Sequence, residues 1–164
     1  MRPDWNGIYP ALTTKLTTDD KLDIPLYLKN IEAQINAGIH GCVIAGSLGE
    51  ASTLSQKEKI SLLDATIAHV DGRIPVVMNI AEQSTAKAVK AAHNAQKSGA
   101  DGLMMLPPMR YLADSYETVE FYKSVANSCD LPIMVYNNPY DYKIEITISM
   151  FEELLKVKNI GATK

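Results

Sequence analysis

Short, almost continuously apolar runs recur along the chain and alternate with segments of helical periodicity. The runs at residues 42–45 and 103–106 do not alternate apolar with polar residues, as a strand with one solvent-exposed face would. They are typical of strands buried on both faces of a parallel sheet. The sequence therefore predicts an α/β fold with six strands, at residues 7–14, 41–46, 76–80, 102–107, 132–137 and 159–164.

Five helices are expected between these strands. They are predicted at about residues 25–37, from Ser55, at about 84–97, after Asp114 or Ser115, and after Thr147. Six strands and five intervening helices do not close an eight-fold barrel, which takes roughly 250 residues. We therefore interpret residues 1–164 as a single (β/α)8 TIM-barrel domain, present as its first six strands and five intervening helices and truncated after strand six.

Composition excludes several classes of partner. Apolar residues make up 46% and charged residues 21%, and the net charge of −3 argues against a nucleic-acid or polybasic membrane surface. No apolar run approaches the roughly 18 residues of a membrane span, and the first residues lack the pattern of a signal peptide. Cys42 and Cys129 form no disulfide framework, and Cys42 is expected as a buried free thiol. A cytoplasmic protein is the expectation.

The carboxyl ends of the strands are where a barrel carries chemistry. Lys164 ends the sixth strand, in surroundings that offer no opposing charge, and desolvation there would favour a neutral amine able to attack a carbonyl. Tyr136 follows the fifth strand and could move protons at the same mouth. A solvated surface lysine and a simple core tyrosine are the structural alternatives for these two residues.

A second candidate is the loop of Gly46, Ser47, Leu48, Gly49 and Glu50, which follows the second strand. Its glycines permit a tight bend, so its exposed amides and the Ser47 hydroxyl could hold a carboxylate. An ordinary glycine turn is the alternative. The three histidines have no companion at metal-ligand spacing, so the sequence indicates no metal site.

An ordered set of motifs resembles the dihydrodipicolinate synthase/N-acetylneuraminate lyase superfamily across essentially the whole chain. The motifs are Tyr-Pro-Ala-Leu-Thr-Thr at 9–14, Gly-Ser-Leu-Gly-Glu at 46–50, Leu-Pro-Pro at 106–108, Tyr-Asn-Asn-Pro at 136–139 and Gly-Ala-Thr-Lys at 161–164. The resemblance implies a (β/α)8 barrel whose lysine forms a Schiff base with pyruvate or another 2-oxo acid, with no separate cofactor. It implies that Lys164 forms the imine, that Tyr136 transfers protons, and that the loop with Gly46, Ser47 and Leu48 binds the substrate.

The resemblance also implies a homo-oligomer, with the tetramer as a common arrangement, and further residues that close the barrel. Two positions depart from the synthase pattern. Leu48 stands where synthases usually carry a second threonine, and Met109 stands where they usually carry a phenol of a tyrosine pair. Tyr111 is displaced from that pair by one or two positions. Branches of the family that cleave, dehydrate or deaminate 2-oxo acids fit these departures better than the lysine-biosynthetic synthases do.

Three other interpretations stay open at this stage. The protein could be a true 4-hydroxy-tetrahydrodipicolinate synthase, or a catalytically inactive barrel fragment that associates with a partner through unpaired strand edges. A small nucleotide-binding α/β protein is the third, and the lack of a glycine-rich phosphate loop disfavours it.

Overall fold

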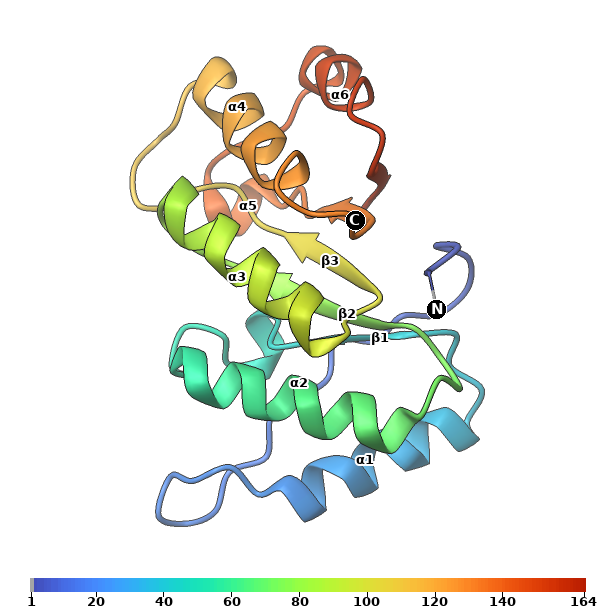
Figure 1. Cartoon of the computed structure of the whole chain (residues 1–164). Coiled ribbons are helices and arrows are strands. Elements are labelled where there is room, and N and C mark those ends of the chain that lie inside the picture. Colours follow the sequence, from blue (N-terminus) through green and yellow to red (C-terminus); the bar gives the residue numbers. More distant parts are fainter. Residues whose placement is uncertain (1) are drawn as a thin grey trace.

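A computed structural model describes residues 2–164, and its named strands form one parallel sheet (Figure 1). The strands lie side by side in chain order: β1 (Cys42–Ile44), β2 (Val76–Ile80), β3 (Gly102–Met105), β4 (Ile133–Val135) and β5 (Ile160–Thr163). Parallel neighbours need a crossover between them, and here each crossover contains a helix. This sequential βα arrangement confirms the predicted fold class, with its polar loops gathered at the carboxyl ends of the strands.

The five predicted helices are all present. They are α1 (Ile24–Asn36), α2 (Gln56–Val70), α3 (Thr85–Ser98), α4 (Ser115–Ala126) and α6 (Ile148–Leu154). Two short helices follow the ends of strands, η1 (Ser47–Gly49) after β1 and α5 (Pro139–Tyr142) after β4. The start of α2 is fixed by a capping box, in which Ser55 and Glu58 each bind the other's backbone N–H.

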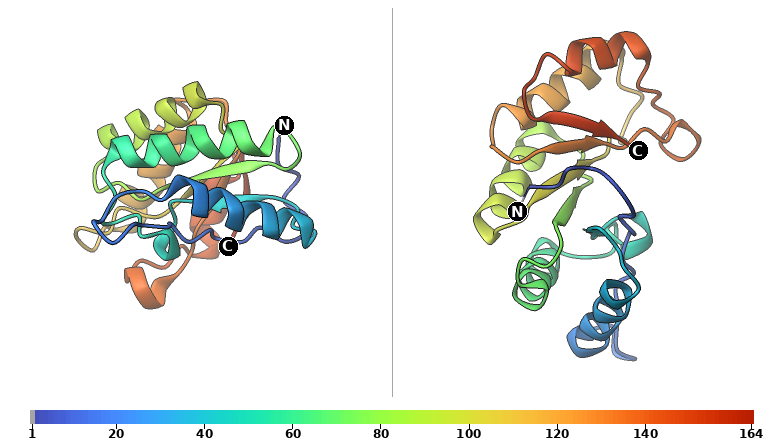
Figure 2. Two further views of the ribbon diagram at one scale, coloured as in Figure 1. Left: turned by 90° about the horizontal axis from the view of Figure 1, so that it is seen from below. Right: turned by 90° about the vertical axis from the view of Figure 1, so that its right-hand side faces the viewer.

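Alternate strand residues face two separate apolar clusters. Residues such as Ile44 and Met105 point toward the helices and join the larger cluster, whereas Val43, Val77 and Met104 belong to a smaller cluster on the opposite, inner face. The long helices line the outer side of a curved sheet (Figure 2). Both faces of the central strands are therefore buried, which accounts for their continuous apolar sequences.

The first of the six predicted strands is reduced to a single bridge. In the segment predicted as strand 7–14, Ala11 pairs in parallel with Val43, but no strand forms. Pro10 has no N–H to give to a ladder, Gly7 adopts a φ of 93°, and the Ile8 N–H donates to the His40 ring instead of to a carbonyl. The segment therefore pairs with β1 only around Val43, whose N–H donates to the Pro10 carbonyl and whose carbonyl accepts from the Leu12 N–H. The described sheet has five strands rather than six.

The cysteines are free, as predicted. Cys42 is fully buried, and burial raises the pKa of its thiol to about 12, so the thiol stays protonated. Cys129 is partly buried. Within residues 2–164, no helix combines the length and the apolar character that a bilayer crossing requires.

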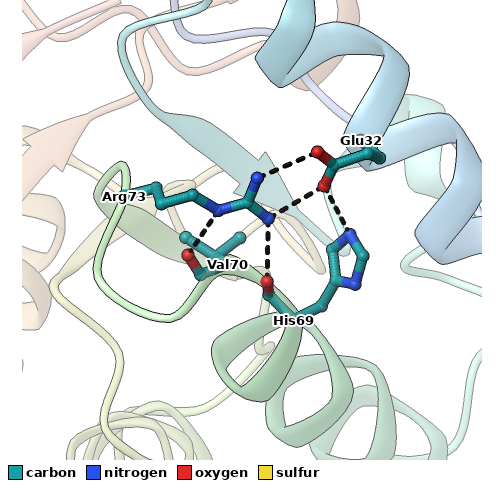
Figure 3. Close-up of polar contacts among 4 residues, drawn as sticks. All are labelled: Glu32, His69, Val70 and Arg73. Carbon is teal, nitrogen blue, oxygen red and sulfur yellow. Dashed lines mark hydrogen bonds and ion pairs between the residues drawn. The ribbon is translucent and has the colours of Figure 1, made fainter.

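A cluster of charged side chains ties α1 to the end of α2 (Figure 3). The Arg73 guanidinium donates to both carboxylate oxygens of Glu32, at 2.9 and 2.8 Å, and also to the backbone carbonyls of His69 and Val70. The His69 ring lies 2.9 Å from the same carboxylate. Because a bidentate arginine pair has a fixed geometry, it holds the two helices in register. The hydrogen bond from Arg73 lowers the pKa of Glu32.

The ion pair of Glu32 with Arg73 predicts a pH-dependent contribution to stability. Glu32→Gln should lower the urea midpoint of the full-length protein at pH 7, because the charged pair with Arg73 is lost. A carboxyl whose pKa is lowered in the folded state stabilises above its unfolded pKa and loses that effect as the pH falls through its folded pKa. The difference in urea midpoint between wild type and variant should therefore narrow below about pH 4.3, the ordinary glutamate pKa.

The control for this prediction is Glu152→Gln, an exposed glutamate on α6. This variant should leave the urea midpoint nearly unchanged both at pH 7 and below about pH 4.3. A gap for Glu32→Gln that is independent of pH would show that the carboxylate charge is not what stabilises the helix pair.

Candidate active site

The last two strands are offset by a bulge that decides where Lys164 points. Ile133 pairs with Ile160 but Met134 pairs with Ala162, so Gly161 is an extra residue in β5. Ile160 packs in the outer cluster and Ala162 against the inner one, although an unbroken strand would place both on the same face. Lys164, two residues after Ala162, consequently lies on the inner side of the sheet with Tyr136.

Backbone hydrogen bonds extend the pairing of β4 and β5 past their named ends. The Lys164 N–H donates to the Val135 carbonyl at 2.9 Å, and the Asn137 N–H donates to the Lys164 carbonyl at 2.9 Å. Lys164 is therefore adjacent to Tyr136 across the strand pair. The Lys164 Nζ lies over the Tyr136 ring, 4.6 Å from its centroid, within cation–π range. The structure thus brings together the predicted amine and the predicted phenol.

The expected desolvation of Lys164 is absent within the described residues. Its side chain is exposed, and Tyr136 is only partly buried. The cause is its position, since β5 forms one edge of the described sheet. The amine is covered by the Tyr136 ring on one side, and residues 2–164 do not enclose it.

The loop after β1 positions Ser47 but not Leu48. Ser47 and Leu48 belong to η1, and the Leu48 side chain is 70% exposed, directed to solvent rather than to the lysine. The N–H groups of Gly49 and Ala51 both donate to the Gly46 carbonyl, so these amides are used within the turn. Fewer backbone N–H groups of this loop are therefore free to bind a carboxylate than the sequence predicted. The Ser47 hydroxyl becomes the main candidate for that role.

Of the two glycines in this loop, Gly49 is the one that close packing requires. A Cβ at Gly49 would lie 2.8 Å from the Leu12 carbonyl oxygen, whereas a Cβ at Gly46 would meet nothing closer than 3.8 Å. The buried Thr14 hydroxyl donates to the Gly49 carbonyl at 2.7 Å. The segment before α1 therefore fixes the loop that carries Ser47.

Tyr142 is a site residue that the sequence analysis missed. Its hydroxyl is hydrogen-bonded to the Ser47 hydroxyl, and its ring meets the Tyr136 ring edge-on, with centroids 5.7 Å apart. Asn138 also reaches this site, because its Nδ2 donates to the Tyr136 hydroxyl at 3.3 Å. The Asn-Pro pair at 138–139, a common helix start, was the available signal for the turn that carries Tyr142.

Asn137 holds the ends of this turn together. Its side-chain amide donates to the Ile146 carbonyl and accepts from the Ile146 N–H, both at 3.0 Å. These two bonds close the loop between β4 and α6, and they fix the segment that contains Tyr142. The Tyr-Asn-Asn-Pro motif therefore supplies a phenol, an asparagine that closes the loop, and an asparagine that donates a hydrogen bond to the phenol.

Ser47 and Tyr142 also line a cleft of about 580 Å³ at the carboxyl side of the sheet. Lys59 and Glu82 contribute charge to its wall, with Nζ and Oε1 3.8 Å apart. Among residues 2–164 there is no group of three histidine, cysteine, aspartate or glutamate side chains arranged to hold a metal ion. The chemical groups at this mouth are the Lys164 amine over the Tyr136 phenol, the Ser47–Tyr142 hydroxyl pair, and the Lys59–Glu82 ion pair in the cleft wall.

The two loop glycines give a paired prediction on stability. Gly49→Ala should destabilise the full-length protein by about 1–3 kcal/mol, because the new methyl group collides with a backbone oxygen. Gly46→Ala should be neutral or stabilising by about 0.4–1 kcal/mol, since its backbone suits alanine and space is available. Urea unfolding measures both, and equal effects of the two variants would contradict the assigned packing.

Comparisons with known proteins agree with this geometry. The chain matches the Dihydrodipicolinate synthetase family over residues 4–164. It is 32% identical to an uncharacterized DapA-like lyase of Rhizobium meliloti, over 100% of this chain and 54% of that protein. It is also 32% identical to a 4-hydroxy-tetrahydrodipicolinate synthase of Methanococcoides burtonii, over 98% of this chain and 54% of that protein.

A solved structure shares the architecture. YagE of Escherichia coli K12, a prophage protein of the dihydrodipicolinic acid synthase family crystallised with pyruvate, superimposes with a TM-score of 0.94 at 30% identity. The match covers 99% of this chain and 55% of YagE. The chain thus spans about half the length of the proteins it matches. The superfamily expected from the motifs is confirmed, and the chain belongs to the Dihydrodipicolinate synthetase family.

Proposed function

We propose that the full-length protein is a lyase in which Lys164 forms a Schiff base with pyruvate or another 2-oxo acid. The observation that carries this proposal is the contact of the Lys164 Nζ with the Tyr136 ring at the carboxyl end of β5. A primary amine beside a phenol is the pairing that imine chemistry uses, since one group attacks the carbonyl and the other moves protons. The pyruvate bound in the YagE crystals supports this class of substrate.

Each residue has a defined task in this reaction. The Lys164 amine adds to the 2-oxo carbon, and the oxygen then leaves as water to give the imine. The protonated imine accepts the electron pair released when a bond at the neighbouring carbon breaks, and Tyr136 transfers the protons involved. The Ser47 hydroxyl donates a hydrogen bond to the substrate carboxylate. The imine forms from the protein's own lysine, so this chemistry requires no separate cofactor.

Among the reactions of the family, we favour aldol cleavage, dehydration or deamination over the lysine-biosynthetic synthase reaction. Leu48 cannot carry a proton, and its side chain lies in solvent. Met109 packs against the inner apolar cluster, and Tyr111 is 54% exposed. Leu48 and Met109 therefore carry no hydroxyl at the two positions where the synthases usually have one.

Borohydride trapping tests the proposal. Pyruvate and sodium borohydride should add the mass of one reduced pyruvate to the full-length protein, and peptide mapping should place it on Lys164. Lys164→Arg should abolish the adduct, because the guanidinium stays protonated near neutral pH and is not a nucleophile.

The matched control is Lys158→Arg, an exposed lysine just before the other end of β5. This variant should label as the wild type does. An adduct on another lysine, or no adduct on the folded wild-type protein, would refute the proposal.

A further inference from the structure

Tyr142 occupies a place that packing and hydrogen bonds determine. It is the last residue of α5, and Lys143 ends that helix with a φ of 61°. Its side chain turns back toward the sheet and packs with the inner cluster, whereas Tyr140 on the same helix is 87% exposed. The two tyrosines share a local backbone but differ completely in surroundings.

Two contacts connect Tyr142 to the proposed reaction centre. Its hydroxyl is hydrogen-bonded to the Ser47 hydroxyl, a contact between residues 95 positions apart in the chain. Its ring lies edge-on against Tyr136 at an interplanar angle of 74°. Tyr136 in turn lies under the Lys164 amine. Ser47 and Tyr142 both line the cleft, so this hydroxyl pair is accessible from the cleft side.

We propose that Tyr142 acts through Ser47 as a proton-relay and positioning residue for imine formation at Lys164. This inference rests on the proposed function. It assigns to a residue of the same chain the second phenol that Met109 does not provide. The Ser47 hydroxyl can donate to only one acceptor at a time, so it turns from the substrate carboxylate to the leaving oxygen as the imine forms, and the Tyr142 phenol then returns a proton to it.

The protons balance in this scheme. As the amine adds to the 2-oxo carbon, one N–H proton passes to the oxygen, and the C–N bond forms. As the imine forms, the C–O bond breaks and the oxygen leaves as water with a second proton. Ser47 gives that proton and takes one from the Tyr142 phenol, and the proton released by the amine nitrogen restores the phenol. The protein groups end as they began, and the neutral imine then takes one proton from solvent water to give the protonated imine.

The test compares rates of imine formation at saturating pyruvate, followed by quenching with borohydride at timed intervals. In the full-length protein, Tyr142→Phe should slow adduct formation by roughly 10²-fold, the lower end of general acid–base effects. The final extent of labelling of Lys164 should equal that of the wild type, which shows that the site is folded and that the amine is competent. Tyr140→Phe should match the wild type in both respects.

Two further measurements separate a relay from a merely structural role. The pH–rate profile of Tyr142→Phe should differ from that of the wild type and of Tyr140→Phe, because a group that transfers protons has been removed. Ser47→Ala combined with Tyr142→Phe should be no slower than the slower single variant, since groups that act as one unit are not additive.

Three results would overturn the inference while leaving the proposed function intact. One is a Tyr142→Phe rate and pH profile equal to those of Tyr140→Phe. Another is full additivity with Ser47→Ala. The third is adduct formation that is roughly 10²-fold slower in Tyr111→Phe but unchanged in Tyr142→Phe, which would place the second phenol in the loop before α4. Absence of any adduct in the wild type would instead reject the proposed function itself.

Discussion

Burial of both faces of the parallel strands is the constraint on which the rest of this structure depends. The outer face is covered by helices, and the inner face carries Val43, Val77 and Met104, each at most 1% exposed. With apolar residues required on both sides, polar side chains gather where the strands end, and the buried Asn79 of β2 is held by a hydrogen bond to the Ala45 carbonyl. The candidate site at the carboxyl ends follows from this, because Ser47 is the first polar side chain after β1 and Lys164 directly follows β5.

Much of the fold could be predicted because its signals are local. Continuous apolar runs located β1 to β5, and the Ser55–Glu58 capping box located the start of α2. The segment at 7–14 was wrongly predicted as a full strand, because its apolar content says nothing about where its N–H groups go. Pro10 lacks that group, and the Ile8 N–H is taken by the ring of His40, 32 residues away.

The candidate site was predictable in part for the same reason. Lys164 and Tyr136 follow neighbouring strands, so their proximity could be expected from the order of the strands alone. The bulge at Gly161, which brings Lys164 onto the inner face, depends on pairing between β4 and β5 and has no distinct local signal. Tyr142 was missed because its contact with Ser47 links two loops that only the tertiary fold brings together. The direction of Leu48 into solvent likewise depends on the geometry of η1.

The most direct test of the central claim is a crystal structure of the full-length protein soaked with pyruvate. The account predicts continuous electron density between the Lys164 Nζ and the 2-oxo carbon of pyruvate, with the carboxylate beside the Ser47 hydroxyl and the imine beside the Tyr136 ring. Pyruvate bound without a covalent bond to Lys164, or attached to a different lysine, would contradict the account.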